Sequence, residues 1–123
     1  MQIGYVNIFV SDLDRAVEFY QTKLGFELKF QDTDHGYASF QTGPISLGLA
    51  VAGDDQPELL GRHTGVGVVV DDLEAEHKRL VGLGATFAMS PERQPWGGFM
   101  ALLEDPDGNK LYLDEVSAAH GDA

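Results

Sequence analysis

The residues with the clearest potential for chemistry are aromatic and acidic side chains that could bind a ligand. The only tryptophan, Trp96, lies in the glycine-rich segment 94–99, just before an expected strand. Loops of this kind often carry binding residues on a rigid scaffold, and an indole face attracts cations. With Asp114 and Asn7 nearby, Trp96 could receive a cationic aromatic compound. The same segment could equally be a hairpin whose tryptophan covers the edge of the core.

Strand alternation assigns further residues to one face of the expected sheet. Successive side chains of a strand point to opposite faces, so one β-branched row in each half should pack under a helix. These rows are Val6, Ile8 and Val10 in the first half and Val66, Val68 and Val70 in the second. The opposite face combines very small with large aromatic side chains, which would leave volume and flat surfaces for a planar ligand. Its members are Tyr5, Asn7, Phe9, Gly48, Gly65, Gly67, Tyr112 and Asp114. The glycines could instead permit close approach between sheets or subunits, with the tyrosines filling the gap.

These strands belong to a unit that occurs twice in the chain. An alternating strand leads into a helix that could begin at Ser11 or Asp12 in the first copy and at Asp71 or Asp72 in the second. The helices should cover residues 13–24 and 73–83, and strands should follow over 26–30, 37–41, 45–51 and 110–116. The sequence therefore predicts an α+β fold of two βαβββ modules, residues 1–53 and 63–117. A polar linker over 54–62 joins them, and residues 118–123 form a tail.

The motifs of this duplicated unit resemble those of the vicinal oxygen chelate superfamily. The superfamily includes glyoxalase I, extradiol dioxygenases, and fosfomycin- and bleomycin-resistance proteins. The resemblance rests on residues 10–20 (VSDLDRAVEFY), 24–26 (LGF) and 104–113 (EDPDGNKLYL), and it covers nearly the whole chain. It implies a cupped mixed sheet, modules that often pair across a homodimer and, in the enzymes, a divalent metal on the concave face. Such motifs are specific for the fold and weak for the chemistry.

The positions that hold the metal in the enzymes of this superfamily carry no ordinary metal donor here. In those enzymes, His, Gln or Glu ligands typically stand in the first and last strands of each half. The matching positions are Tyr5, Gly48, Gly65 and Tyr112. Divalent ions need imidazole or carboxylate donors to offset their dehydration. The resemblance therefore implies no cofactor and no catalytic residue, as in the bleomycin-resistance branch.

A displaced metal site is the alternative. His63, Glu104 and Asp114 lie near the vacant positions and could hold the metal of a lyase, transferase or dioxygenase. The other histidines are poorer candidates. We expect His77 to be packed or hydrogen-bonded on its helix, and His35 and His120 to be exposed in a loop and in the tail.

Charge and composition narrow the class of ligand. The formal net charge of −12, from 20 acidic and 8 basic residues, disfavours nucleic acid and anionic lipid as partners. The acidity could attract a cationic ligand or serve solubility alone. The absence of cysteine excludes a disulfide framework and a thiolate zinc site. We expect no signal peptide and no membrane span, and hence a cytoplasmic protein.

Together these features predict a small-molecule-binding protein that sequesters an antibiotic or a cationic metabolite without metal. The groove would be shared by two subunits of a homodimer, with the modules paired within a chain or exchanged between chains. A structural or regulatory module without a ligand is a third interpretation. The sequence does not name the ligand.

Overall fold

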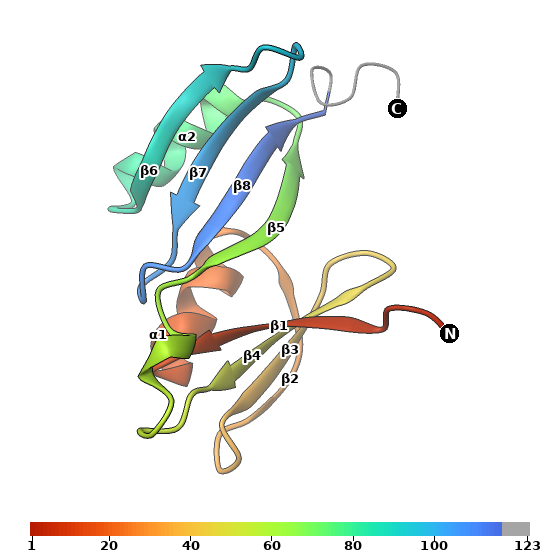
Figure 1. Ribbon diagram of the computed structural model, residues 1–123, viewed down its shortest axis with the longest axis vertical. Helices are drawn as coiled ribbons and strands as arrows, with labels where there is room; N and C mark the ends of the chain where they lie inside the picture. The colour runs from red at the N-terminus through yellow and green to blue at the C-terminus, as the bar shows by residue number, and fades with distance from the viewer. Residues whose placement is uncertain (117–123) are drawn as a thin grey trace. The chain divides into compact units, whose positions relative to one another are not determined.

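The computed structural model describes residues 1–116 and contains the βαβββ order twice (Figure 1). The first module consists of β1 (Tyr5–Val10), α1 (Leu13–Glu18), β2 (Glu27–Asp32), β3 (Tyr37–Gln41) and β4 (Ser46–Val51). The second consists of β5 (His63–Val70), α2 (Leu73–Gly82), β6 (Thr86–Arg93), β7 (Phe99–Glu104) and β8 (Lys110–Glu115). The predicted α+β class and the two βαβββ modules are confirmed. The expected tail and His120 lie outside the described residues.

Each module forms its own four-stranded mixed sheet. The strand orders are β1-β4-β3-β2 and β5-β8-β7-β6, so the two sheets have the same topology. In each sheet the first strand pairs in parallel with the last, and the other neighbours are antiparallel. Contacts along the chain divide it into two compact units, one ending at Arg62 and the next beginning at His63. No helix in residues 1–116 is long and apolar enough to cross a membrane.

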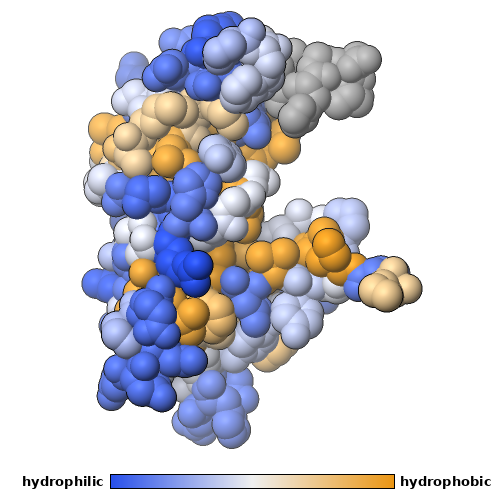
Figure 2. Space-filling view, viewed as in Figure 1, coloured by the Kyte–Doolittle hydropathy of each residue, from blue (hydrophilic) through white to orange (hydrophobic). Residues whose placement is uncertain are grey.

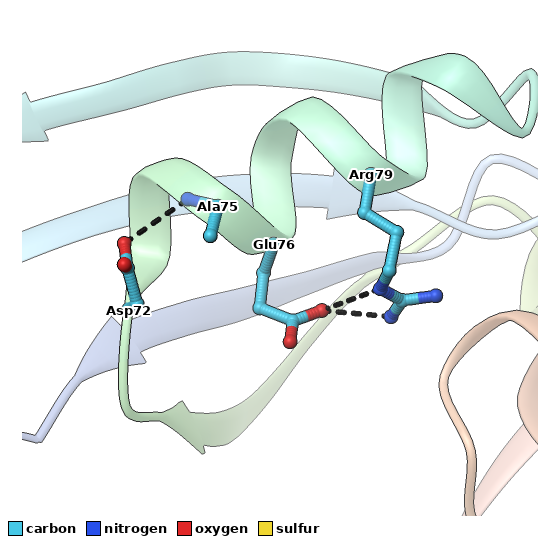
Figure 3. A network of polar contacts seen from close by, with 4 residues as sticks. All are labelled: Asp72, Ala75, Glu76 and Arg79. Atoms are coloured by element: carbon cyan, nitrogen blue, oxygen red, sulfur yellow. Dashed lines mark hydrogen bonds and ion pairs between the residues drawn. The ribbon is translucent and has the colours of Figure 1, made fainter.

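Both α-helices begin at an aspartate N-cap, the later of the two candidates in each module. The Asp12 carboxylate accepts a hydrogen bond of 3.1 Å from the backbone N–H of Arg15. The Asp72 carboxylate does the same for Ala75 at 3.1 Å (Figure 3). Such a cap satisfies one of the backbone donors that a helix start leaves without a partner.

An ion pair lies on the surface of α2, one turn beyond its N-cap. Arg79 Nε and Nη2 both donate to Glu76 Oε1, at 2.9 and 2.7 Å (Figure 3). A partly exposed pair of this kind contributes only about 0.2–0.5 kcal/mol. The helix is therefore held mainly by its apolar stripe, in which Leu73 and Leu80 are buried.

The first helix differs from the continuous α-helix that the sequence predicts over 13–24. It is α-helical only to Glu18 and continues as a π-helical turn over Phe19–Lys23. The backbone N–H of Leu24 donates to the Phe19 carbonyl at 3.1 Å, which closes the wider turn. This turn allows two consecutive aromatic residues, Phe19 and Tyr20, to be buried together. The segment ends at Gly25 with φ of 79°, as the sequence predicts.

The core of the first module is an aromatic cluster. Tyr20 and Phe40 are both fully buried, and their ring centroids lie 6.2 Å apart. Phe26 lies 6.4 Å from each of them. Large rings at such distances bury much apolar area and add specific ring contacts. Because this cluster buries one face of β3 on the helix side, the opposite face of the sheet is the one left uncovered.

The second module has an aliphatic core and a buried polar turn. The buried core residues are Leu73, Leu80, Ala101, Leu103, Leu111 and Leu113. Between β7 and β8, Asp105 is only 5% exposed. Its carboxylate accepts hydrogen bonds of 2.9 Å from Asp107 N–H, Asn109 N–H and Asn109 Nδ2. Gly108 has φ of 80°, as this turn requires. His77 packs its ring on Phe87 at 4.6 Å, which confirms it as a packed helix histidine.

Candidate functional site

One face of the first sheet is not covered by α1, and we call it the first open face. Its central row across the sheet is Asn7, Gly48, Ser39 and Phe30. A flanking row is Phe9, Ala50, Tyr37 and Asp32. The residues between these rows, such as Ile8, Leu49 and Ala38, are buried on the helix side. The predicted site residues Tyr5, Asn7, Phe9 and Gly48 therefore share the open face.

The space above Gly48 is filled. The hydroxyl of Tyr37 donates a hydrogen bond of 3.2 Å to Asn7 Oδ1, and the pair lies directly over Gly48. A Cβ added at Gly48 would overlap both Asn7 Oδ1 and the Tyr37 hydroxyl, and it would lie 3.0 Å from Tyr37 Cζ. At this position the structure differs from the expectation of free volume, because the glycine permits a close approach of two polar side chains.

Two aromatic residues of the first open face were missed by the sequence analysis. Phe30 is 53% exposed, and its ring lies 5.9 Å from that of Tyr37. Simple alternation from the half-buried Leu28 would place Phe30 in the core, but the register shifts between Leu28 and Phe30. This bulge moves Phe30 to the open face. Tyr37 could have been found, since it alternates with the buried Ala38 and Phe40.

The hairpin after β2 carries a fixed negative charge. The carboxylate of Asp32 accepts hydrogen bonds from the backbone N–H of His35 at 3.1 Å and from its imidazole at 2.9 Å. These hydrogen bonds, first the backbone one and then the side-chain one, hold the pKa of Asp32 below its ordinary value. Asp32 therefore stays ionised at neutral pH and adds to the acidity of the first open face. His35 is exposed in a loop, as the sequence predicts.

The second sheet also has a face that its helix does not cover, the second open face. Its middle row is Gly67, Tyr112, Leu102 and Met89, and the next row is Val69, Asp114, Met100 and Glu92. The predicted residues Gly65, Gly67, Tyr112 and Asp114 thus lie together on one face. Val66, Val68 and Val70 alternate with them and are half-buried, as expected.

The glycines of the second open face have free space above them, unlike Gly48. Nothing lies within 4 Å of a Cβ built on Gly65, and only Asp114 Oδ2 lies near one on Gly67, at 3.8 Å. The ring of His63 packs on that of Tyr112, with centroids 4.9 Å apart. The surface therefore offers an uncovered strip of backbone beside a pair of rings and a half-buried carboxylate.

Trp96 lies in the hairpin loop between β6 and β7. The loop is closed by hydrogen bonds from Gln94 N–H to the Gly98 carbonyl at 2.8 Å and from Gly97 N–H to the Gln94 carbonyl at 2.9 Å. The indole rests on Gly98, where an added Cβ would lie 2.6 Å from Trp96 Nε1. Because Trp96 is 64% exposed, it does not cover the core edge and remains accessible to a ligand.

Two βαβββ modules, each closed by a parallel pair of first and last strands, define the class of fold. Residues 2–113 match the family model of the Glyoxalase/Bleomycin resistance protein/Dioxygenase superfamily, and the chain belongs to this superfamily. The resemblance found in the sequence is confirmed.

Named relatives include a resistance protein, an antibiotic binding protein and a lyase. The chain is 32% identical to the bleomycin resistance protein of Klebsiella pneumoniae, over 87% of this chain and 86% of the relative. It is 29% identical to the lactoylglutathione lyase of Haemophilus influenzae, over 98% of each. Among solved structures, it is similar to TnmS3, an antibiotic binding protein from Streptomyces sp. CB03234. The TM-score is 0.77 at 30% identity, over 94% of this chain and 95% of that chain.

The residues at the superfamily's metal positions do not fit a divalent ion. Tyr5, Gly65 and Tyr112 offer no imidazole or carboxylate, and Gly48 is covered by Asn7 and Tyr37. A side chain long enough to bind metal from position 48 would have to displace that hydrogen-bonded pair.

The residues of the alternative metal site, His63, Glu104 and Asp114, do not come together on the second open face. His63 and Glu104 both pair with Lys110, whose ammonium group opposes a bound cation. Asp114 lies four residues further along β8, about 13 Å away. The backbone N–H of Gly65 also donates to His63 Nδ1 at 3.1 Å. Among residues 1–116, no group of three or more His, Asp or Glu side chains could hold a metal ion.

Proposed function

We propose that this protein binds a planar, cationic small molecule on the second open face and sequesters it without metal or chemical conversion. The observation that carries the proposal is the combination of Asp114, Tyr112 and the uncovered Gly67 on one surface. The named relatives support it, because one is a bleomycin resistance protein and another an antibiotic binding protein.

Asp114 supplies the preference for a cation. Its carboxylate is half-buried between Val69 and Met100, and it makes no hydrogen bond or ion pair within the described residues. A partly desolvated carboxylate without a partner is costly, so a ligand cation there would gain a charge-assisted contact. Lys110 is not the partner of Asp114, because it lies in a different row of the sheet and its Nζ is 3.4 Å from the Gly108 carbonyl oxygen.

Tyr112 and the uncovered glycines supply the preference for a flat ligand. An aromatic plane can approach the backbone closely at Gly65 and Gly67, where a side chain would stand in its way. Tyr112, supported by His63, offers a ring against which that plane can stack. The exposed Trp96 in the same module adds a second aromatic surface with affinity for cations.

A homodimer is part of this proposal. The segment before β1 and the start of that edge strand expose apolar side chains, including Ile3 at 71% and Tyr5 at 62% (Figure 2). A second copy would cover these residues and the free edge of β1. Native mass spectrometry of the intact chain would then give the mass of a dimer.

The test compares two probes of the same shape that differ in charge. At pH 8, 10-methylacridinium is a cation and acridine is neutral, and saturable quenching of Trp96 fluorescence measures the affinity of each. We expect 10-methylacridinium to bind about tenfold more tightly, equivalent to about 1.4 kcal/mol, and Asp114→Asn to remove most of this preference.

Asp54→Asn is the matched control, because it makes the same change of net charge in the exposed segment between the modules. Equal losses in both variants would show that net charge, and not Asp114, attracts the cation. If neither probe nor bleomycin quenches Trp96 saturably or raises the melting temperature, the proposed function is wrong.

A further inference from the structure

The hydrogen-bonded pair over Gly48 spans the centre of the first open face. Asn7 stands on β1 and Tyr37 on β3, and the strand between them contributes only the glycine. The pair is a specific arrangement, because its two polar atoms occupy the position that any other residue at 48 would fill with Cβ. A glycine inside a strand weakens the sheet and is usually present because something must approach closely.

The pair retains hydrogen-bonding capacity on its open side. An asparagine amide has two N–H donors, and a phenolic oxygen that donates can still accept. Within residues 1–116, Asn7 Oδ1 accepts from Tyr37, whereas Asn7 Nδ2 makes no hydrogen bond. Both side chains are half-buried, so these groups are reached from the open face alone. The outward donors are therefore those of the Asn7 amide.

Two aromatic rings lie near the pair on the first open face. The exposed ring of Phe30 stands 5.9 Å from the Tyr37 ring and shares the central row with Asn7 and Gly48. Phe9 lies two residues beyond Asn7 along β1, on the same face and in the row of Tyr37. A planar ligand resting on these rings would bring one edge to the Asn7 amide.

We propose that Asn7 and Tyr37, held together over Gly48, form a polar anchor that binds the carbonyl oxygen of a planar ligand on the first open face. Asn7 donates to the carbonyl. Tyr37, Gly48 and Phe30 are positioning residues, because they orient the Asn7 amide and support the ligand plane. The assignment rests on the proposed function in that it takes the chain to bind planar small molecules, and it concerns the first open face by itself.

The test uses two flat probes that differ only at one carbon, 9-fluorenone with a carbonyl and fluorene with a methylene. Equilibrium dialysis measures their binding to the full chain. We expect wild-type protein to bind 9-fluorenone about tenfold more tightly, which is the scale of one well-placed hydrogen bond. Asn7→Asp should abolish the preference, because it keeps the acceptor for Tyr37 and removes the outward donor.

Two further variants and one control separate the anchor from a structural role. Tyr37→Phe keeps the ring and frees the Asn7 amide to turn, and Gly48→Ala displaces both side chains, so each should reduce the preference at least threefold. Gln41→Glu makes the same amide-to-acid change elsewhere on the first sheet and should leave the preference for 9-fluorenone intact. In wild-type protein, the Asn7 side-chain amide resonances should shift with 9-fluorenone and not with fluorene.

The outcomes distinguish the two proposals. Equal binding of 9-fluorenone and fluorene, binding of neither, or a preference that survives Asn7→Asp would overturn the anchor. If 10-methylacridinium still binds in any of those cases, the proposed function stands without the anchor. A preference for 9-fluorenone that Asn7→Asp removes supports the anchor even if the cation probe fails.

Discussion

Phe40→Ala should destabilise the first module by about 4 kcal/mol, the usual cost of deleting a fully buried phenylalanine ring. Phe40 is 0% exposed and packs against both Tyr20 and Phe26, so its loss leaves a cavity in the aromatic cluster. Urea unfolding followed by far-ultraviolet circular dichroism would measure the effect as a lower midpoint.

The matched control is Phe30→Ala, which removes the same ring from the neighbouring strand of the same sheet. Phe30 lies on the first open face, and its deletion should cost less than about 1 kcal/mol. The comparison therefore tests the assignment of the two faces of the first sheet, on which the proposed anchor depends. Equal costs for the two variants would show that the first open face is covered in solution.

Asp105→Ala should destabilise the second module by about 3 kcal/mol. The substitution removes a buried acceptor and leaves the backbone N–H groups of Asp107 and Asn109 without their partner. Losing charge-assisted hydrogen bonds and orphaning buried donors are among the most costly single changes. The fluorescence of Trp96 reports this module during urea unfolding, because it is the only tryptophan in the chain.

Asp54→Ala provides the comparison for that loss. It removes an aspartate from an exposed turn and should change the free energy of unfolding by less than about 0.5 kcal/mol. If Asp105→Ala were as mild, the turn between β7 and β8 would be closed by its proline and glycine alone.

The sequence predicts the fold of this protein well because the sequence signals for its helices and strands are local. The N-caps Asp12 and Asp72, the left-handed glycines at 25 and 108 and the alternation of β1 and β5 each depend on neighbouring residues only. Duplication then reinforces some of these signals, since the N-cap at Asp12 recurs at Asp72 and the left-handed Gly25 recurs at Gly84. The βαβββ order and the faces of β1 and β5 follow from these features.

The details that the sequence does not predict depend on contacts between strands. A bulge in β2 decides that Phe30 leaves the core, and no local pattern marks it. The π-helical turn arises because Phe19 and Tyr20 are both drawn into the core. From the sequence alone, Gly48 predicts free volume above the sheet. Only the structure shows that the side chains of Asn7 on β1 and Tyr37 on β3 cover it.

In the candidate site, too, the sequence predicts some features and only the structure shows the others. Alternation places Gly67, Tyr112 and Asp114 on one face, and the structure adds that Gly67 is uncovered. The set His63, Glu104 and Asp114 looks like a possible metal site in the sequence because all three are donors. The register places Asp114 in a different row from His63 and Glu104, which both lie beside Lys110.

Binding of a ligand without metal is the central claim, and native mass spectrometry of the intact chain with 10-methylacridinium tests it most directly. Protein treated with a chelator should give a dimer whose mass increases by whole numbers of the probe and by nothing else, and the probe should be recovered unchanged. Binding that the chelator abolishes and that zinc, nickel, manganese or iron restores, or a probe recovered in altered form, would contradict the account.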